Sequence, residues 1–131
     1  MREIKFRAWD KINNCWLDWS EQRTTLEFEN GVPCRIVLHE TEGYLEKGDF
    51  ELVEFTGLKD KHGGEIYEGD IVREWNGDMR EIVFNSSRAA FIAKMCPKPM
   101  VDMPTWIRRI KEPEVISNIY ENPELLVKKD K

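Results

Sequence analysis

Four carboxylates lie close together between Asp60 and Val72, and their types and spacing could do chemistry. Asp60, Glu65, Glu68 and Asp70 carry the oxygen ligands that Ca²⁺ and Mg²⁺ prefer, and a pair of carboxyl groups can act as general acid and base. An EF-hand loop needs oxygen-bearing side chains at its third and fifth positions, where this stretch has a histidine and a glycine. A less regular divalent-metal site and a carboxylate pair remain as alternatives to a structural role.

The same stretch has the composition of successive backbone turns. Its glycines supply conformations that residues with a Cβ adopt only at a cost. An aspartate in such a turn can accept backbone N–H groups, and each such hydrogen bond stabilises the fold by about 1 kcal/mol. We therefore interpret the stretch and its flank as a fold-specifying motif, formed by Gly57, Asp60, Gly63, Tyr67, Gly69 and Asp70.

Few other residues could take part in a reaction. His39 and His62 are the only histidines, and the cysteines Cys15, Cys34 and Cys96 are widely spaced, with no CxxC pair. The sequence also lacks GxxxxGK[ST], GxGxxG, GxSxG and HExxH, the common signatures of nucleotide binding, dinucleotide binding, esterases and zinc proteases. We expect a protein that is not an enzyme and that requires neither a cofactor nor a metal.

Composition favours one folded domain. The 131 residues include 40% hydrophobic and 34% charged side chains, enough for a core under a charged surface. The formal net charge of −5 disfavours a general coat for nucleic acid or an anionic membrane. No signal-peptide apolar region and no run approaching the roughly 18 apolar residues of a spanning helix are present. We expect a cytoplasmic protein with reduced thiols and no membrane partner.

Alternating apolar residues and tight turns predict a mainly β chain with antiparallel pairing. Asn30-Gly31 and Asn76-Gly77 favour hairpin turns, in which positive φ is required. Pro33 lacks an N–H group and is expected at a sheet edge. The expected strands are residues 4–9, 15–19, 26–28, 34–38, 50–55, 71–75, 81–84, 89–93, 105–110 and 114–119, the last two with helical turns as an alternative.

The segments between these strands suggest how the domain is organised. Glu40 to Gly48 is polar and contains glycine, which predicts a loop and an internal boundary. We therefore expect a single domain over 1–131, with an N-terminal β-hairpin region at 1–49 and a core at 50–127. Asn122-Pro123-Glu124 has the order of an N-cap, a first-turn proline and an acid, which predicts a short C-terminal helix.

The first expected strand also suggests a binding surface. If its other residues face the core, Lys5, Arg7 and Trp9 share the outer face and form a row of cations and an aromatic ring. Proteins that bind single-stranded nucleic acid use such rows. The alternative is a tryptophan covered by a neighbouring loop or subunit. Further candidate phosphate contacts are Arg73, Arg80, Arg108 and Arg109.

Three blocks of this sequence resemble the YopX family of phage and prophage proteins. They are REIKFRAWDK from Arg2 to Lys11, FTGLKDKHGGEIYEGDIV from Phe55 to Val72, and VISNIYENPELL from Val115 to Leu126. The blocks stand in the order found in the family. The middle block is the most specific of the three.

The resemblance implies a bacteriophage or prophage protein that acts in the cytoplasm of a bacterial host. It also implies a mainly β fold with an SH3-like barrel element, so that the core at 50–127 would be barrel-like. The family has no established biochemical function and no agreed catalytic residues. We therefore expect a noncatalytic binding or assembly module that acts through protein contacts, with a protein partner or as a homo-oligomer. The alternative is an accessory protein that binds single-stranded nucleic acid.

Overall fold

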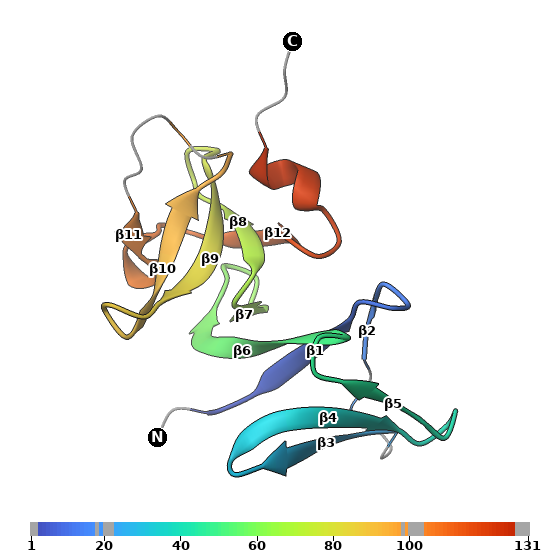
Figure 1. Ribbon diagram of the computed structural model, residues 1–131. Helices are drawn as coiled ribbons and strands as arrows, with labels where there is room; N and C mark the ends of the chain where they lie inside the picture. Colours follow the sequence, from blue (N-terminus) through green and yellow to red (C-terminus); the bar gives the residue numbers. More distant parts are fainter. Residues whose placement is uncertain (1–2, 18, 20–22, 98, 100–103, 128–131) are drawn as a thin grey trace. The chain divides into compact units, whose positions relative to one another are not determined.

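The computed structural model describes residues 3–17, 19, 23–97, 99 and 104–127. The expected mainly β chain with antiparallel sheets is confirmed (Figure 1). The strands are β1 (Phe6–Asp10), β2 (Cys15–Trp16), β3 (Thr24–Glu29), β4 (Val32–Leu38), β5 (Gly43–Glu46), β6 (Phe50–Lys59), β7 (Glu65–Tyr67), β8 (Asp70–Arg73), β9 (Met79–Asn85), β10 (Ala90–Met95), β11 (Thr105–Trp106) and β12 (Glu114–Asn118). Two short 3₁₀ helices are η2 (Ile107–Arg109) and η3 (Pro123–Leu126).

The chain forms two compact units. Unit 2 is the continuous segment Phe6–Val53, and unit 1 consists of Met1–Lys5 together with Glu54–Lys131. In the sheet order β2-β1-β6-β7, strand β6 begins in unit 2 and ends in unit 1. The first five residues therefore group with the C-terminal part of the chain.

Unit 1 contains a five-stranded antiparallel sheet in the order β11-β10-β9-β8-β12, which curls into a half-barrel. Branched side chains suit strands buried in this way because their restricted rotamers pack well on a pleated surface. Ile71, Val72 and Ile82 are fully buried, and Phe91 and Ile110 pack in the same core as Val72 and Ile82.

Unit 2 contains a three-stranded antiparallel sheet in the order β3-β4-β5. Its core gathers Ile36 and Leu45 from this sheet with Ala8 from β1 and Phe50 from β6. Alternation within β4 and β5 places one side chain in two against this core. The small number of buried side chains is consistent with a unit of this length.

Both Asn-Gly sequences form turns as expected. Asn30 and Gly31 have φ of 51° and 79° and join β3 to β4. Gly77 has φ of 90° in the connection from β8 to β9, where Asn76 Oδ1 accepts the Asp78 N–H at 3.0 Å. Pro33 lies in the middle strand of its sheet, at a register shift and beyond the part of β4 that pairs with β5. Because β5 does not pair with β4 at Pro33, the absence of an N–H group there costs no hydrogen bond between these two strands.

Two sequence expectations about the elements are wrong, and a third is met in part. Residues 43–46, expected in a loop, form β5, because Leu45 enters the core opposite Ile36. Both alternatives expected for residues 105–110 occur in part, because a strand ends at Trp106 and the 3₁₀ turn η2 follows it. The alternation expected in the first strand also fails, since Ala8, Trp9 and Asp10 are all buried while Phe6 is exposed.

The expected C-terminal helix is a single 3₁₀ turn. The Asn122 side chain makes no capping hydrogen bond; its Oδ1 accepts from the Ser117 hydroxyl, and its Nδ2 donates to Glu124 at 2.8 Å. A turn without its cap does not offset the entropic cost of helix nucleation. In the described ranges, no helix is long and apolar enough to span a bilayer.

Truncating the core of unit 1 should be costly. We expect Ile82→Ala to lower the free energy of unfolding by about 2–5 kcal/mol, because it removes three carbons from a fully buried site and leaves a cavity. Ile4→Ala is the matched control in the same unit, since Ile4 is 66% exposed, and it should change the free energy by less than about 0.5 kcal/mol. Urea titration of both variants measures the difference, and equal losses would contradict this assignment of the core.

Candidate functional site

The Asp60 carboxylate is held by three backbone N–H groups. Oδ1 accepts from His62 at 3.0 Å and from Gly64 at 2.8 Å, and Oδ2 accepts from Val115 at 3.0 Å. The first two bonds close the turn between β6 and β7, in which Gly63 has φ of 83°. The third joins this turn to β12, which lies 55 residues further along the chain. The two local bonds are those of an aspartate in a turn, whereas the bond from Val115 is not contained in the sequence of the turn.

Asp70 is bound in a second turn, between β7 and β8. The side chain is 2% exposed, and its Oδ2 accepts the Tyr67 N–H at 2.8 Å. Gly69 donates its N–H to Ile82 at 2.7 Å and accepts from Ile119 at 2.9 Å, with φ of 88°. A Cβ on Gly69 would lie 3.0 Å from the Tyr120 ring, so the residue needs both positive φ and the absence of a side chain.

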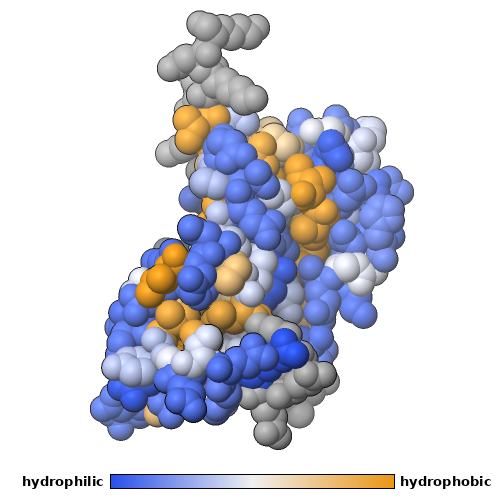
Figure 2. All heavy atoms as spheres, turned by 90° about the vertical axis from the view of Figure 1, so that its right-hand side faces the viewer, coloured by the Kyte–Doolittle hydropathy of each residue, from blue (hydrophilic) through white to orange (hydrophobic). Residues whose placement is uncertain are grey.

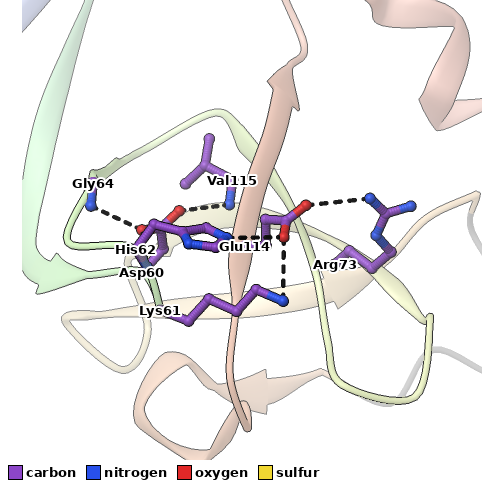
Figure 3. Close-up of polar contacts among 7 residues, drawn as sticks. All are labelled: Asp60, Lys61, His62, Gly64, Arg73, Glu114 and Val115. Carbon is purple, nitrogen blue, oxygen red and sulfur yellow. Dashed lines mark hydrogen bonds and ion pairs between the residues drawn. The ribbon is translucent and has the colours of Figure 1, made fainter.

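Three cationic or ionisable side chains surround the carboxylate of Glu114 on β12 (Figure 3). Lys61 Nζ and His62 Nε2 each lie 3.2 Å from Oε2, and Arg73 Nη2 lies 3.3 Å from Oε1. Lys61 also donates its backbone N–H to the Pro113 carbonyl oxygen at 2.8 Å. The cluster therefore joins the β6–β7 turn and β8 to β12 by charge as well as by backbone hydrogen bonds.

The pKa values of these acids follow from their neighbours. The contact with His62, and next those with Lys61 and Arg73, lower the pKa of Glu114 to about 2. Burial raises the pKa of Asp60, but the N–H groups of Val115, Gly64 and His62 together outweigh burial, so the net shift is downward. Both carboxyl groups are therefore ionised near neutral pH, and neither is prepared to donate a proton as a general acid.

A third acid of the stretch, Glu65, belongs to a separate pair. Its carboxylate binds the Lys5 ammonium, and the Tyr67 hydroxyl donates to it at 3.4 Å. The hydrogen bond from Lys5 lowers the pKa of Glu65, and the same bond raises the pKa of Lys5. Across the described ranges, no three His, Cys, Asp or Glu side chains are grouped so that they could hold a metal ion.

The residues of the expected Lys5, Arg7 and Trp9 row belong to different units and have different contacts. Lys5 pairs with Glu65 in unit 1, whereas Arg7 and Trp9 belong to unit 2. Trp9 is 7% exposed and packs edge-on against Trp16 at 5.0 Å between ring centroids. The Arg7 guanidinium lies 3.9 Å from the centre of the Trp16 ring. Trp9 is therefore buried within unit 2, against the neighbouring strand β2.

The four candidate phosphate contacts also differ in their surroundings. Arg73 pairs with Glu114, and Arg80 pairs with Glu74 at 2.8 Å, in a place where both side chains are largely buried. Arg108 and Arg109 are exposed in η2, which follows Trp106 directly. Sequence reasoning did not join Trp106 to these arginines, although the run WIRR at 106–109 contains all three residues.

Removing the Asp60 charge should destabilise unit 1. Asp60→Asn replaces one accepting oxygen by an NH₂ group, which leaves at least one backbone N–H without its partner. We expect a loss of about 1–3 kcal/mol in the free energy of unfolding, measured by urea titration. Asp78→Asn is the control, because Asp78 accepts from the Asn76 side chain at 3.1 Å in an exposed turn, and its loss should stay below about 0.5 kcal/mol. An Asp60→Asn protein as stable as the parent would contradict the role of this carboxylate.

The ion cluster predicts a pH dependence of stability. The pKa of Glu114 is lower in the folded chain, at about 2, than its ordinary value of 4.5, so its contribution is present above the ordinary pKa and is lost as the pH falls from about 4.5 towards about 2. Glu114→Gln should therefore show a smaller drop in melting temperature between pH 5 and pH 3, roughly, than the parent chain. Glu112→Gln, two residues away and exposed, should keep the parental pH profile. Identical profiles for all three proteins would rule out this contribution.

Comparison with curated proteins returns no match. Among solved structures, the crystal structure of protein EF1440 from Enterococcus faecalis is similar, with a TM-score of 0.65 and 24% sequence identity over 97% of this chain and 100% of that chain. At this identity the likeness supports the fold alone. The model of the YopX protein family matches residues 5–127, nearly the whole sequence, and the chain therefore belongs to the YopX family.

Proposed function

We propose that this chain is a noncatalytic binding module that acts through protein contacts in bacteriophage or prophage physiology, in the cytoplasm of the bacterial host. The partner that we propose is a second copy of the same chain, so that the module forms a homo-oligomer. We further propose that the half-barrel of unit 1 is of the SH3-like kind. The chain belongs to the YopX family, and the resemblance to that family, which implies a phage or prophage protein, supports the phage setting.

The contacts of the acidic stretch support a role without catalysis. The Asp60 carboxylate accepts hydrogen bonds from backbone N–H groups, and the Glu65 carboxylate binds Lys5. Glu114, which adjoins the stretch from β12, contacts three side chains. A catalytic acid or base needs a pKa near the working pH and a free edge towards a substrate. The downward pKa shifts of these three carboxyl groups are those of acids that hold a fold together.

The observation that carries the proposal is the β3–β4 hairpin of unit 2. Strand β5 pairs with β4 from Arg35 to Leu38, so the hairpin tip extends past the end of β5. At this tip Phe28 is 56% exposed and Val32 is 57% exposed. These two large apolar side chains stand in neighbouring pairs of the projecting hairpin, and association with another protein would remove exposed apolar area there from water.

The outer edge of β3 offers a way to make that association. Within the described ranges β3 pairs with β4 alone, so its other edge presents backbone N–H and C=O groups. In an antiparallel pair of two β3 strands centred on Leu26, Leu26 would face its own copy, Thr25 would face Glu27 and Thr24 would face Phe28. No two glutamates stand directly opposite in this register, so the like-charge repulsion that disfavours many self-pairings is reduced.

Hydrophobic residues also reach the surface elsewhere. Figure 2 shows one face on which they appear in separate places between hydrophilic residues. Single exposed apolar side chains are normal in soluble proteins. The hairpin differs because two such side chains and a strand edge occur together.

A photocrosslinking amino acid at position 28 tests the proposal. In bacteria that express the chain together with its native phage genes, we expect position 28 to give a crosslinked dimer. Ile12 is the matched control, since it is an apolar residue of the same unit and is 62% exposed, and substitution there should give little dimer. Light scattering of the purified chain should show a mass above that of the 15.5 kDa monomer, and Phe28→Ser with Val32→Ser should return it to the monomer.

Two outcomes would contradict the proposal. One is a strict monomer that gives no more crosslinking to any protein at position 28 than at position 12. The other is a dimer that is unchanged by the paired serine substitutions while the fold, checked by circular dichroism, is retained.

A further inference from the structure

Unit 1 contains a pocket of about 440 Å³ beside β11 and η2. Its apolar lining includes Leu58, Phe91 and Ile107, and its polar lining includes Arg108 and Arg109. Trp106 also lines it, and this residue is 42% exposed. A volume of this size lies within the range of small-ligand sites and can take one planar ring with part of a charged backbone.

Apart from Arg7, which lies against Trp16, the described arginines fall into two groups. Arg23, Arg35, Arg73 and Arg80 each form an ion pair with a glutamate. Arg88, Arg108 and Arg109 form no ion pair within the part of the chain that the structure describes, although acids outnumber bases by 25 to 20. Two of these three arginines line the pocket, and Arg88 lies next to Ala89, which also lines it.

The Trp106 ring of the pocket already lies beside a cation. The Arg88 guanidinium lies 5.7 Å from the centre of the Trp106 ring. An exposed indole ring with guanidinium groups nearby is suited to a ligand that is both planar and anionic. In a nucleotide the base can stack on the indole ring, and the phosphate can bind the arginines. An acidic peptide could form ion pairs with the arginines, but its carboxylate side chains would not stack on the indole ring.

We propose that this pocket binds single-stranded nucleic acid, with one base stacked on Trp106 and the neighbouring phosphates at Arg108 and Arg109. A duplex does not fit this chemistry, because its base faces are already stacked. Outside the pocket, the net charge of −5 repels a phosphate backbone, so we expect nucleic acid to bind only at the pocket. Binding should be strongest at low salt. The activity is distinct from the protein contacts of unit 2 and does not depend on them.

Fluorescence anisotropy of a labelled oligothymidylate of about 12 nucleotides tests the proposal, a length within the site sizes of known single-strand binders. We expect binding that weakens steadily between about 50 and about 200 mM salt. Trp106→Leu should weaken it by roughly tenfold or more, and Trp106→Tyr, which keeps a stacking ring, should weaken it much less. Arg108→Gln with Arg109→Gln should weaken binding and also reduce its salt dependence.

Matched variants separate the site from general effects. Trp75→Leu removes a tryptophan of the same unit that is 64% exposed and does not line the pocket, so binding should be unchanged. Arg23→Gln with Arg35→Gln removes the same charge from unit 2 and should have little effect. Thermal melts verify that each variant is folded.

Three results would overturn the proposal. The first is no binding up to about 100 µM protein at low salt, the weak end of ordinary nonspecific affinity. The second is equal weakening by the Trp106 and Trp75 variants. The third is competition by thymidine monophosphate or by an acidic peptide as strong as that by the unlabelled oligonucleotide, which would assign the pocket to a free nucleotide or to a protein.

Discussion

The bond between the Asp60 carboxylate and the Val115 N–H is the constraint on which unit 1 depends. It joins residues that are 55 positions apart, and its distance is 3.0 Å. Because the same carboxylate also closes its own turn, the direction of the chain after β6 and the position of β12 are set by one side chain. The ion contacts of Glu114, the neighbour of Val115, add attraction across the same junction but are more exposed and weaker.

Local chemistry explains what the sequence predicted well. The Asn-Gly turns need only the permissive backbones of two residues, so their hairpins follow from the sequence alone. Asp60, Asp70 and Gly69 were identified as turn formers for the same reason, since an aspartate bound by nearby amides and a glycine at positive φ are features of a short segment. In each of these cases the interactions that determine the turn lie within about five residues of one another in the sequence.

Long-range packing explains what the sequence could not predict. Residues 43–46 are a strand only because β4 provides a partner and the core accepts Leu45. Trp9 is buried because Trp16 stands opposite it across the β1–β2 pair, which overrides simple alternation. The contacts of Val115 and Glu114 with the acidic stretch, and the meeting of Arg88 with Trp106, also join distant segments. No pattern in a single segment contains that information.

The division of the chain has a consequence for its synthesis. Unit 2 is one continuous segment, whereas unit 1 requires the first five residues as well as everything after Val53. On the ribosome, Phe6–Val53 is complete early and can begin to fold while translation continues. Lys5 must wait for Phe55, whose N–H it accepts at 2.9 Å, and for Glu65, whose carboxylate it binds. Lys5 is thus synthesised before Phe55 and Glu65, and it can bind them only after the segment that carries them has been made.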